Sequence, residues 1–450
     1  MKTSQIPTRA ALVVATLAVL GGAIALATIG SIPPTPQELV RHELPAAVRI
    51  DPAHPCTREA AEAPAPPPPD GVAAHFDPPQ NAVVVTAGQG ATLPALARAV
   101  ANPDLLREEA PGEWLLGADL ALLPGTSLQI SAPTTRWLKL LSTAGRYASV
   151  KAFGGSIDVS GACITSWDPA KGTVDTEPAD GRGFLLARDG GQMNIDHAEI
   201  RYLGHGEVES YGLSWRTEGT GGKLTNSIVS HNFFGLYSYE VGGLVISDNE
   251  IHDNVLYGID PHTGSHNLTI ERNVVHDNGK HGIILAEDCV DNVIRDNVVY
   301  RNNHHGIVVY LRSDRNTVEG NDSFANAAQG INVNEANDNA IRGNRVYDNN
   351  ESGIGITQTS QNNLVENNQA RGNKQDGVRV VSEAALTTLH ANTLGENGRY
   401  GVYVDIDGDV DIAGNLIFAN RSGIMLKGSA VVPDGDNAIF DNLERAVIAG

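Results

Sequence analysis

The chain has 450 residues, and its 32 Lys and Arg against 53 Asp and Glu give a formal net charge of -21. This acidic balance argues against a nucleic-acid partner and against binding to an anionic membrane surface. The three cysteines, Cys56, Cys163 and Cys289, are too few and too scattered for a metal site or a disulfide scaffold. We therefore expect no metal and no cofactor. If the compartment is oxidising, Cys56 could pair with Cys163.

The N-terminus indicates export. Residues 1–9 carry Lys2 and Arg9 without an acidic residue, and an apolar run follows from 10 to 30. The segment Ala25 to Ala27 fits a small-residue cleavage site, which favours a removable signal peptide. The apolar run is also long enough to serve as an uncleaved membrane anchor. Both alternatives place the rest of the chain outside the cytoplasm, as a periplasmic, secreted or membrane-tethered protein.

The next two segments are predicted to be a linker and a cap. Residues 31–80 are rich in Pro and Ala, a composition that favours an extended linker. Residues 81–135 are expected to form an N-terminal cap and the first coils, with a short helix from Thr92 to about Val100. Such a helix would shield the open edge of the first coil, a requirement in repeat folds.

A repeat of about two dozen residues dominates the segment 136–450. An aromatic or polar residue, a glycine and an aliphatic residue recur together at intervals of 22 to 24 residues. The repeat glycines are Gly212, Gly235, Gly258, Gly282, Gly306, Gly330, Gly353, Gly377, Gly401 and Gly423. Two asparagine columns keep the same spacing, one from Asn226 through Asn249 to Asn415 and one from Asn254 to Asn420.

Short strands with alternating apolar residues lie between these columns, and no segment between them is long enough for a helix. This pattern predicts an all-β fold, a right-handed parallel β-helix, and we expect it to be monomeric. The glycines are expected to supply positive φ at the turns. The asparagines are expected to tolerate the left-handed region at corners and to hydrogen-bond along their columns.

Equal offsets from the repeat glycine are expected to lie above one another in neighbouring coils, about 4.8 Å apart. One residue before the glycine, consecutive coils carry Tyr257, His281 and His305. Two residues before it, they carry Lys280 and His304. We therefore predict a ladder of positive and titratable side chains along one edge of three coils.

The strand that begins at the glycine after Tyr257 departs from the repeat, because Pro261 cannot donate to a strand ladder. Asp260 and His262 flank this proline and project to the same face. An exposed Asp and His would be unremarkable on most sheets. Here the proline breaks a rule that the other coils keep, and such violations tend to mark functional sites.

The segment YGIDPH and the HDNGKHGI run after it resemble the alginate (mannuronan) C-5 epimerases, in particular their periplasmic β-helical type. The resemblance continues upstream through ESYGLSW and FGLYSYE and covers roughly Leu115 to the C-terminus. It implies active-site roles for Tyr257, Asp260 and His262 and an acidic polysaccharide as the substrate. Tyr239, from FGLYSYE, is included among the substrate-binding candidates.

The sequence departs from the family pattern at three positions. Thr263 stands where the periplasmic branch usually has an acid, and Glu287 aligns with its carboxylate-neutralising Arg. His304 replaces the Arg of an Arg-His pair in the secreted branch. Lys280 and Arg312 could supply the missing positive charge.

The chemistry can also be argued from the residues. Abstracting H-5 of a hexuronate gives an enolate-like intermediate, so the sugar carboxylate must be neutralised by a cation or a protonated acid. His262 is the natural base, Tyr257 the partner acid, and Asp260 orients His262 or binds a sugar hydroxyl. The remaining candidates are expected to bind substrate: Lys280, His281, His304, His305, Arg312 and Tyr239. We predict a polyuronate C-5 epimerase. The alternatives are a β-eliminating lyase, if the glycosidic oxygen is protonated instead, and a non-catalytic glycan-binding β-helix.

Overall fold

The structure, a computed structural model, describes residues 35–44, 49–57, 71–428 and 436–449. The expected signal peptide or anchor over residues 1–30 lies outside these ranges. Among the helices within them, none has the length and apolar character needed to cross a membrane.

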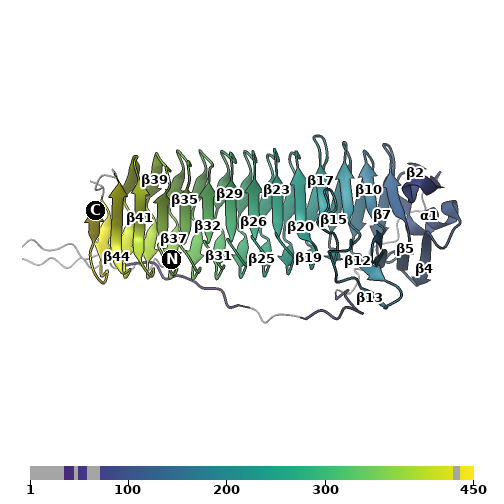
Figure 1. Ribbon diagram of the computed structural model, residues 1–450, viewed down its shortest axis with the longest axis horizontal. Helices are drawn as coiled ribbons and strands as arrows, with labels where there is room; N and C mark the ends of the chain where they lie inside the picture. The colour runs from purple at the N-terminus through teal and green to yellow at the C-terminus, as the bar shows by residue number, and fades with distance from the viewer. Residues whose placement is uncertain (1–34, 45–48, 58–70, 429–435, 450) are drawn as a thin grey trace, which may run out of the picture. The chain divides into compact units, whose positions relative to one another are not determined.

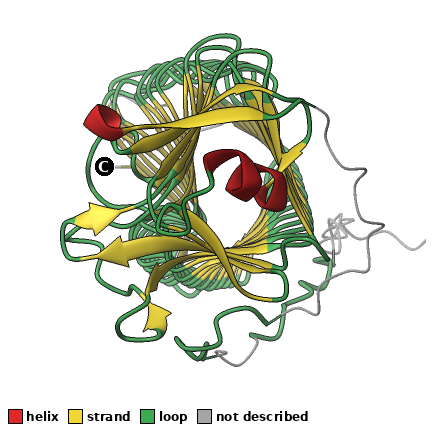
Figure 2. Cartoon of the chain, turned by 90° about the vertical axis from the view of Figure 1, so that its right-hand side faces the viewer, coloured by secondary structure: helices red, strands yellow, loops and turns green. Residues whose placement is uncertain are grey.

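The described chain coils into a parallel β-helix, and each regular coil contributes one strand to each of three sheets (Figures 1 and 2). The predicted fold class is therefore confirmed. Two short helical turns accompany the strands, a 3-10 turn over Pro78–Gln80 and the helix α1 over Leu93–Val100.

Sheet A carries the candidate site and pairs parallel throughout except at its first strand. Its strands are β1 (Ala73–Asp77), β2 (Ala82–Ala87), β6 (Asp119–Leu122), β10 (Val150–Phe153), β14 (Leu185–Arg188), β17 (Gly212–Arg216), β20 (Phe234–Tyr239), β23 (Ile259–His262), β26 (Ile283–Ala286), β29 (Ile307–Tyr310), β32 (Ile331–Asn334), β35 (Ile354–Thr357), β38 (Val378–Val381), β41 (Tyr400–Ile406), β44 (Ser422–Gly428) and β46 (Val447–Ala449).

Sheet B is wholly parallel. Its strands are β3 (Ala91–Thr92), β7 (Ser127–Ser131), β11 (Ser156–Ser160), β15 (Gln192–Asp196), β18 (Gly221–Thr225), β21 (Val245–Ser247), β24 (Thr269–Glu271), β27 (Val293–Arg295), β30 (Thr317–Glu319), β33 (Ala340–Arg342), β36 (Leu364–Glu366), β39 (Thr387–His390) and β42 (Val410–Ala413).

Sheet C is parallel along the array and has antiparallel additions in its first coils. Its strands are β4 (Leu106–Ala110), β5 (Glu113–Leu116), β8 (Trp137–Thr143), β9 (Arg146–Tyr147), β12 (Cys163–Asp168), β13 (Thr173–Val174), β16 (Glu199–Arg201), β19 (Ile228–Ser230), β22 (Glu250–His252), β25 (Val274–His276), β28 (Val298–Tyr300), β31 (Asp322–Phe324), β34 (Arg345–Tyr347), β37 (Gln369–Arg371), β40 (Thr393–Gly395), β43 (Leu416–Phe418) and β45 (Ala438–Phe440).

The first coils are closed by α1, which lies across the end of the array (Figure 2). Leu93 and Leu96 point into the core with no exposed area. Thr92 is the N-cap residue, but its side chain makes no capping hydrogen bond. The cap begins earlier than expected, because β1 lies in the segment assigned to a linker and pairs antiparallel with β2.

The second asparagine column forms a buried amide ladder. Asn278 donates through Nδ2 to Oδ1 of Asn302 at 3.0 Å, and Asn302 donates to Asn326 at 3.0 Å. Apart from Asn226, which has φ 51°, the asparagines of the two predicted columns do not adopt the left-handed conformation that we expected. In the first column, for instance, Asp248 has φ 59° and precedes Asn249. The ladder therefore needs its asparagines for their amides and not for a left-handed backbone.

Two further details of the predicted columns are wrong. Asn226 is not a rung of the first ladder, because the backbone N–H of Ser227 takes that place and donates to Asn249 Oδ1 at 3.0 Å. The repeat glycine Gly258 does not adopt positive φ. A Cβ at Gly258 would lie 2.6 Å from the carbonyl oxygen of Gly282, so the residue is required for lack of space between coils.

A strap, defined as residues 35–44 and 49–57, runs beside sheet C (Figure 1). Arg371 donates to the carbonyl oxygen of Gln37 at 2.9 Å, and the backbone N–H of His42 donates to the hydroxyl of Tyr347 at 3.0 Å. Cys56 and Cys163 form a disulfide, so the pairing considered from the sequence is present. Part of the segment assigned to a linker is thus bound to the array.

Candidate active site

The exceptional strand β23 presents Asp260 and His262 on the outer face of sheet A. Its register places Asp260 beside Tyr237 and His262 beside Tyr239 of β20. Toward β26, pairing is recorded at the two ends of β23, whereas Pro261 and Asp260 have no paired partner there. The missing N–H of the proline accounts for the local break in the ladder.

The structure brings the predicted edge ladder together. The ring of Tyr257 stacks on that of His281 with centroids 5.5 Å apart, and His281 stacks on His305 at 5.2 Å. The ring of His304 meets His281 edge-on at 4.8 Å. Lys280 donates from Nζ to the hydroxyl oxygen of Tyr257 at 2.7 Å. One cation and one phenol therefore flank three imidazoles.

Of the predicted positive and titratable side chains, the three imidazoles are uncharged because burial lowers their pKa values. Burial lowers the pKa of His281 to about 2 and that of His305 to about 3, and the neighbouring imidazoles lower both further. Burial also lowers the pKa of His304. The three imidazoles are therefore neutral at pH 7, and Lys280 alone among these four side chains carries charge.

Asp260 is a buried carboxyl group without a hydrogen-bond partner. Its side chain is 1% exposed, and no described residue hydrogen-bonds its Oδ1. Burial raises the pKa of Asp260 to about 8, against the opposing charge of Lys280. Asp260 therefore keeps its proton at neutral pH, as a neutral acid that can donate a hydrogen bond.

His262 is held by a chain of polar contacts. Its Nδ1 lies 2.8 Å from Oγ1 of Thr263, and that hydroxyl donates to Oε2 of Glu287 at 3.0 Å. The backbone N–H of Thr263 donates to the carbonyl oxygen of Ala286 at 2.8 Å and also lies 3.0 Å from Nδ1 of His262. Because the hydroxyl of Thr263 gives its only hydrogen to Glu287, its oxygen is left to accept a hydrogen bond from Nδ1. We therefore assign the proton of the neutral imidazole to Nδ1, which leaves Nε2 as the basic nitrogen.

The pKa of His262 is lowered by burial, while the charge of Glu287 opposes that shift and the charge of Arg216 adds to it. His262 is thus a neutral base at pH 7. Thr263 and Glu287, the two departures from the family pattern nearest to it, act together, because the hydroxyl of one joins the imidazole to the carboxylate of the other.

Two binding candidates end up in different positions. Arg312 donates from Nε and Nη2 to the two oxygens of Asp288, each at 2.8 Å, so the charge that we expected to replace the family Arg is already paired. Tyr239 lies beside His262 in the register of sheet A. Arg312 therefore stays a binding candidate whose charge is shared with Asp288, whereas Tyr239 borders the site.

Arg216 was missed by the sequence analysis. It lies in the same row as Tyr239 and His262, its guanidinium sits 4.8 Å from the ring centroid of Tyr239, and no described residue hydrogen-bonds its Nη1. The row could have been found from the sequence. All three side chains stand four residues after a repeat glycine, an offset that we did not compare across coils.

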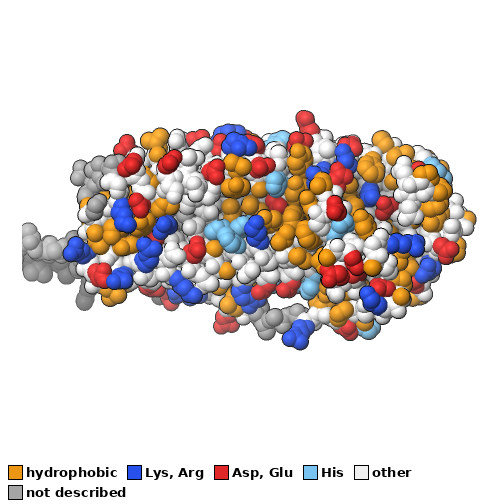
Figure 3. All heavy atoms as spheres, viewed as in Figure 1, with side chains coloured by type: hydrophobic (Ala, Val, Ile, Leu, Met, Phe, Trp, Pro, Cys, Tyr) orange, Lys and Arg blue, Asp and Glu red, His pale blue; other side chains and the backbone are white. Residues whose placement is uncertain are grey.

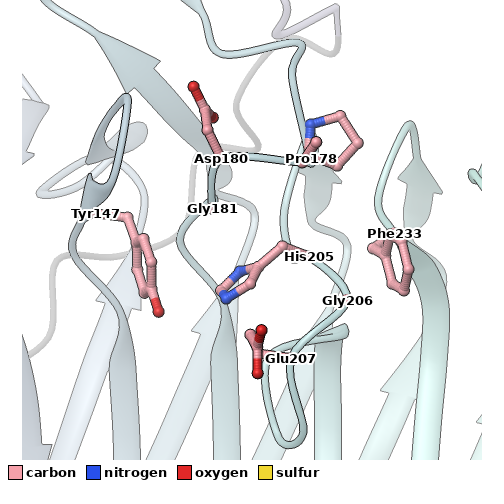
Figure 4. Close-up of a pocket in the computed structure, with 9 residues that line it drawn as sticks. Tyr147, Pro178, Asp180, Gly181, His205, Gly206, Glu207 and Phe233 are labelled. Carbon is pink, nitrogen blue, oxygen red and sulfur yellow. The ribbon is translucent and has the colours of Figure 1, made fainter.

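A cavity of about 500 Å³ is lined by residues from the four coils that precede the coil of Tyr257 (Figure 4). Tyr147, His205 and Phe233 line it together with the carboxylates of Asp180 and Glu207. The two acids make the cavity unsuited to a sugar carboxylate. It therefore adds room near the candidate site without adding a second place for a uronate.

Comparisons with known proteins were made against family models, curated relatives and solved structures. A family model described as periplasmic copper-binding protein (NosD) matches residues 192–322 and 225–368. A second, described as right handed beta helix region, matches residues 309–442. The described residues contain no group of three or more His, Cys, Asp or Glu that could hold a metal ion. The described residues therefore do not fit a copper site.

The curated relatives that are similar in sequence are enzymes of one kind. A mannuronan C5-epimerase of Pseudomonas fluorescens is 33% identical over 181 residues, which cover 37% of this chain and 33% of the relative. The enzyme of the same name from Pseudomonas aeruginosa is 30% identical over 182 residues, covering 37% of this chain and 32% of the relative. The predicted resemblance is confirmed. The chain spans about a third of the length of the curated relatives that it matches.

The solved structures agree with the fold. The crystal structure of the periplasmic alginate epimerase AlgG aligns with a TM-score of 0.64 and 22% identity, covering 82% of this chain and 85% of that one. At this identity the likeness establishes the β-helix, and the chemistry rests on the residues of the site.

Proposed function

We propose that this protein is a mannuronan C-5 epimerase that acts on an alginate-like polyuronate. The observation that carries the proposal is the arrangement on β23, where a neutral base at His262 and a neutral acid at Asp260 share one outward face. The confirmed sequence resemblance to mannuronan C5-epimerases supports it.

In the proposed reaction, the carboxylate of the sugar accepts a hydrogen bond from protonated Asp260 and faces the ammonium group of Lys280. Both interactions strengthen as charge builds on the carboxylate in the enolate-like intermediate. The neutral acid thereby takes over part of the role that a cation would have at the position of Glu287. Asp260 is assigned to the carboxylate instead of orienting His262, because the imidazole is held by Thr263.

Proton transfer uses two residues, His262 and Tyr257, which act on opposite faces of the sugar ring. Nε2 of His262 takes H-5, the C5–H bond breaks, and its electron pair moves into the enolate. The Tyr257 hydroxyl then gives its proton to C5 from the opposite face, and the ammonium group of Lys280, 2.7 Å away, stabilises the phenolate that remains. Exchange of protons with water restores both groups. The net result is inversion at C5 without cleavage of the chain.

Glu287 and Thr263 are positioning residues in this mechanism. As Nε2 of His262 gains a proton, the imidazole becomes a cation, and the carboxylate of Glu287 stabilises that charge through the hydroxyl of Thr263. This explains how an acidic residue can stand where the family pattern has an arginine. It serves the base, while Asp260 and Lys280 serve the substrate.

We place the protein outside the cytoplasm, most specifically in the periplasm, with residues 1–30 as its export signal or membrane tether. The disulfide between Cys56 and Cys163 supports an oxidising compartment. The similar AlgG structures are those of a periplasmic alginate epimerase, which is consistent with this location.

Incubation of the purified protein with polymannuronate, followed by proton NMR, tests the function. Epimerisation gives guluronate signals and no unsaturated ends, whereas a lyase gives signals of unsaturated ends. Binding without either product would identify a glycan-binding β-helix. In D2O an epimerase also incorporates deuterium at C5, and the absence of both new sugars and deuterium would contradict the proposal.

A further inference from the structure

Three cations meet around one tyrosine near the C-terminal end of sheet A. The guanidinium groups of Arg379 and Arg399 lie 4.7 Å and 5.4 Å from the ring centroid of Tyr403, and the ammonium group of Lys427 lies 5.4 Å from it. These side chains, the distal cluster, come from β38, β41, β44 and the residue that precedes β41. In Figure 3, Lys and Arg side chains gather over this end of the array, where Figure 1 places β41 and β44.

Two carboxylates hold the side chains of the distal cluster in position. The carboxylate of Asp376 has no exposed area and lies 3.4 Å from Nη1 of Arg379 and 3.7 Å from Nε of Arg399. The hydroxyl of Tyr403 donates to Asp405 at 2.7 Å. The guanidinium-bearing side chains remain accessible, 27% for Arg379 and 41% for Arg399. The cations are thus fixed and still reachable by a ligand.

The distal cluster is aligned with the candidate active site. Arg379 and Tyr403 belong to the row of sheet A that begins at Tyr237 and Asp260, and Arg399 has the same offset from its repeat glycine as Lys280. Five steps of sheet A separate β23 from β38. At one strand spacing per step, the two sites are roughly 24 Å apart along the array.

The strip of sheet A between the two sites carries no charge. Each of its strands contributes two outward-facing residues, and each of these residues is paired with the equivalent residue of the next strand. The residues of the strip are Ile284, Ala286, Val308, Tyr310, Asn332, Asn334, Gly355 and Thr357. Glu351, which has the same offset from its repeat glycine as Lys280 and Arg399, is an acid in the column beside the strip. In a chain of net charge -21, an uncharged strip with cations at both ends is the path on this face least repulsive to a polyanion.

We propose that the distal cluster is a second binding site for the polyuronate, occupied by the carboxylates of the same chain whose target residue lies at His262. This inference rests on the proposed function and extends it. The cations pair with sugar carboxylates, and the buried ring of Tyr403 holds the three of them in one place. The site would favour long chains over short ones, because a short oligomer cannot reach both places.

Binding of defined mannuronate oligomers tests the proposal in the His262→Ala background, where turnover is expected to be slower by a factor of about 10² to 10⁴. The double variant Arg399→Gln and Lys427→Gln should raise the Kd of a long oligomer at least about tenfold at low salt and leave that of a tetramer unchanged. Arg272→Gln, which removes an exposed cation between sheets B and C, is the matched control and should change neither. The single variant Lys427→Gln is a second test that should not disturb folding, because the side chain of Lys427 contacts no buried acid.

Equal affinities of the double variant and its parent for the long oligomer would overturn the distal site, whatever the protein catalyses. Length-dependent binding that the double variant abolishes, in a protein whose wild type has no turnover, would uphold the distal site and reject the epimerase. Equal weakening of long and short oligomers would also reject it, because the loss would then be general.

Discussion

Asp260 and His262 lie two residues apart on one face, and burial moves their pKa values in opposite directions. The pKa of Asp260 is raised to about 8, and that of His262 is lowered, so both are neutral at pH 7. Environments that separate two titratable groups in this way commonly assign the acid and the base in an active site. The site therefore holds an uncharged donor and an uncharged acceptor before substrate binds.

A bell-shaped dependence of kcat/KM on pH follows. Activity should fall at low pH as His262 gains a proton, below the usual imidazole range because its pKa is lowered. It should fall at high pH as Asp260 loses its proton near pH 8. Asp260→Asn keeps a hydrogen-bond donor without a titrating proton. Its profile should lack the alkaline limb, and an unchanged alkaline limb would assign that limb to another group.

His262→Ala should lower turnover by a factor of about 10² to 10⁴, the usual worth of a general base. Tyr257→Phe should do the same, because the phenol returns the proton. Neither side chain joins the buried amide ladders, so the melting temperature should stay nearly unchanged. His390→Ala, an exposed histidine on sheet B, is the control. Full activity of His262→Ala in NMR assays would remove the base from the mechanism.

Glu287→Gln should lower kcat and move the acidic limb to still lower pH, since the charge of Glu287 raises the pKa of His262. Thr263→Val should produce the same shift by breaking the link between them, and Thr263→Ser should restore the wild-type profile. We expect losses in kcat of about tenfold, with KM little affected, because neither side chain is assigned to the substrate. A rise in KM alone would place Glu287 at the substrate instead.

The residue rows of the site could be predicted from the sequence, because a solenoid converts equal offsets into neighbours. Their protonation could not. The pKa values of His281 and Asp260 follow from how much water each side chain loses, which depends on side chains from several coils. The pairing of Arg312 with Asp288, by contrast, follows from the repeat, because each residue stands six positions after a repeat glycine in neighbouring coils.

At the scale of the elements, the amide ladders hold one coil to the next. In the second column each asparagine both donates to the following rung and accepts from the preceding one, and each rung is buried. The spacing of the columns could be read from the sequence. The reason for each residue type could not, because the crowding at Gly258 and the left-handed turn at Asp248 are properties of folded corners.

Asn302→Ala should lower the free energy of unfolding by about 1–3 kcal/mol, because the backbone N–H and Nδ2 of Asn278 lose the acceptor Oδ1 of Asn302, and Oδ1 of Asn326 loses one of its two donors. Asn303→Ala is a matched control one residue away, since the side chain of Asn303 is exposed. Chemical denaturation followed by circular dichroism compares the two variants. Equal stability would show that the ladder adds nothing beyond the strand hydrogen bonds.

At the scale of the whole molecule, a net charge of -21 and a polyanionic substrate conflict only if the charge is spread evenly. The described part of sheet A carries cations at the candidate site and at the distal cluster, with an uncharged strip between them. The acidic surplus elsewhere keeps the protein soluble and repels polyuronate from other faces. Binding should therefore weaken with salt mainly through those few cations.

The strap also fixes an order of events during synthesis. Gln37 is bonded to Arg371, which is made 334 residues later, while Cys56 pairs with Cys163 across a separation of 107 residues. As the chain emerges from its N-terminus, the disulfide can close once the first coils exist, but the rest of the strap must wait for coils near the other end. Until then the ring of Tyr347 and its neighbours lack their cover. The docked strap therefore distinguishes a finished array from a truncated one, and a protease that cleaves the undocked segment would remove incomplete chains selectively.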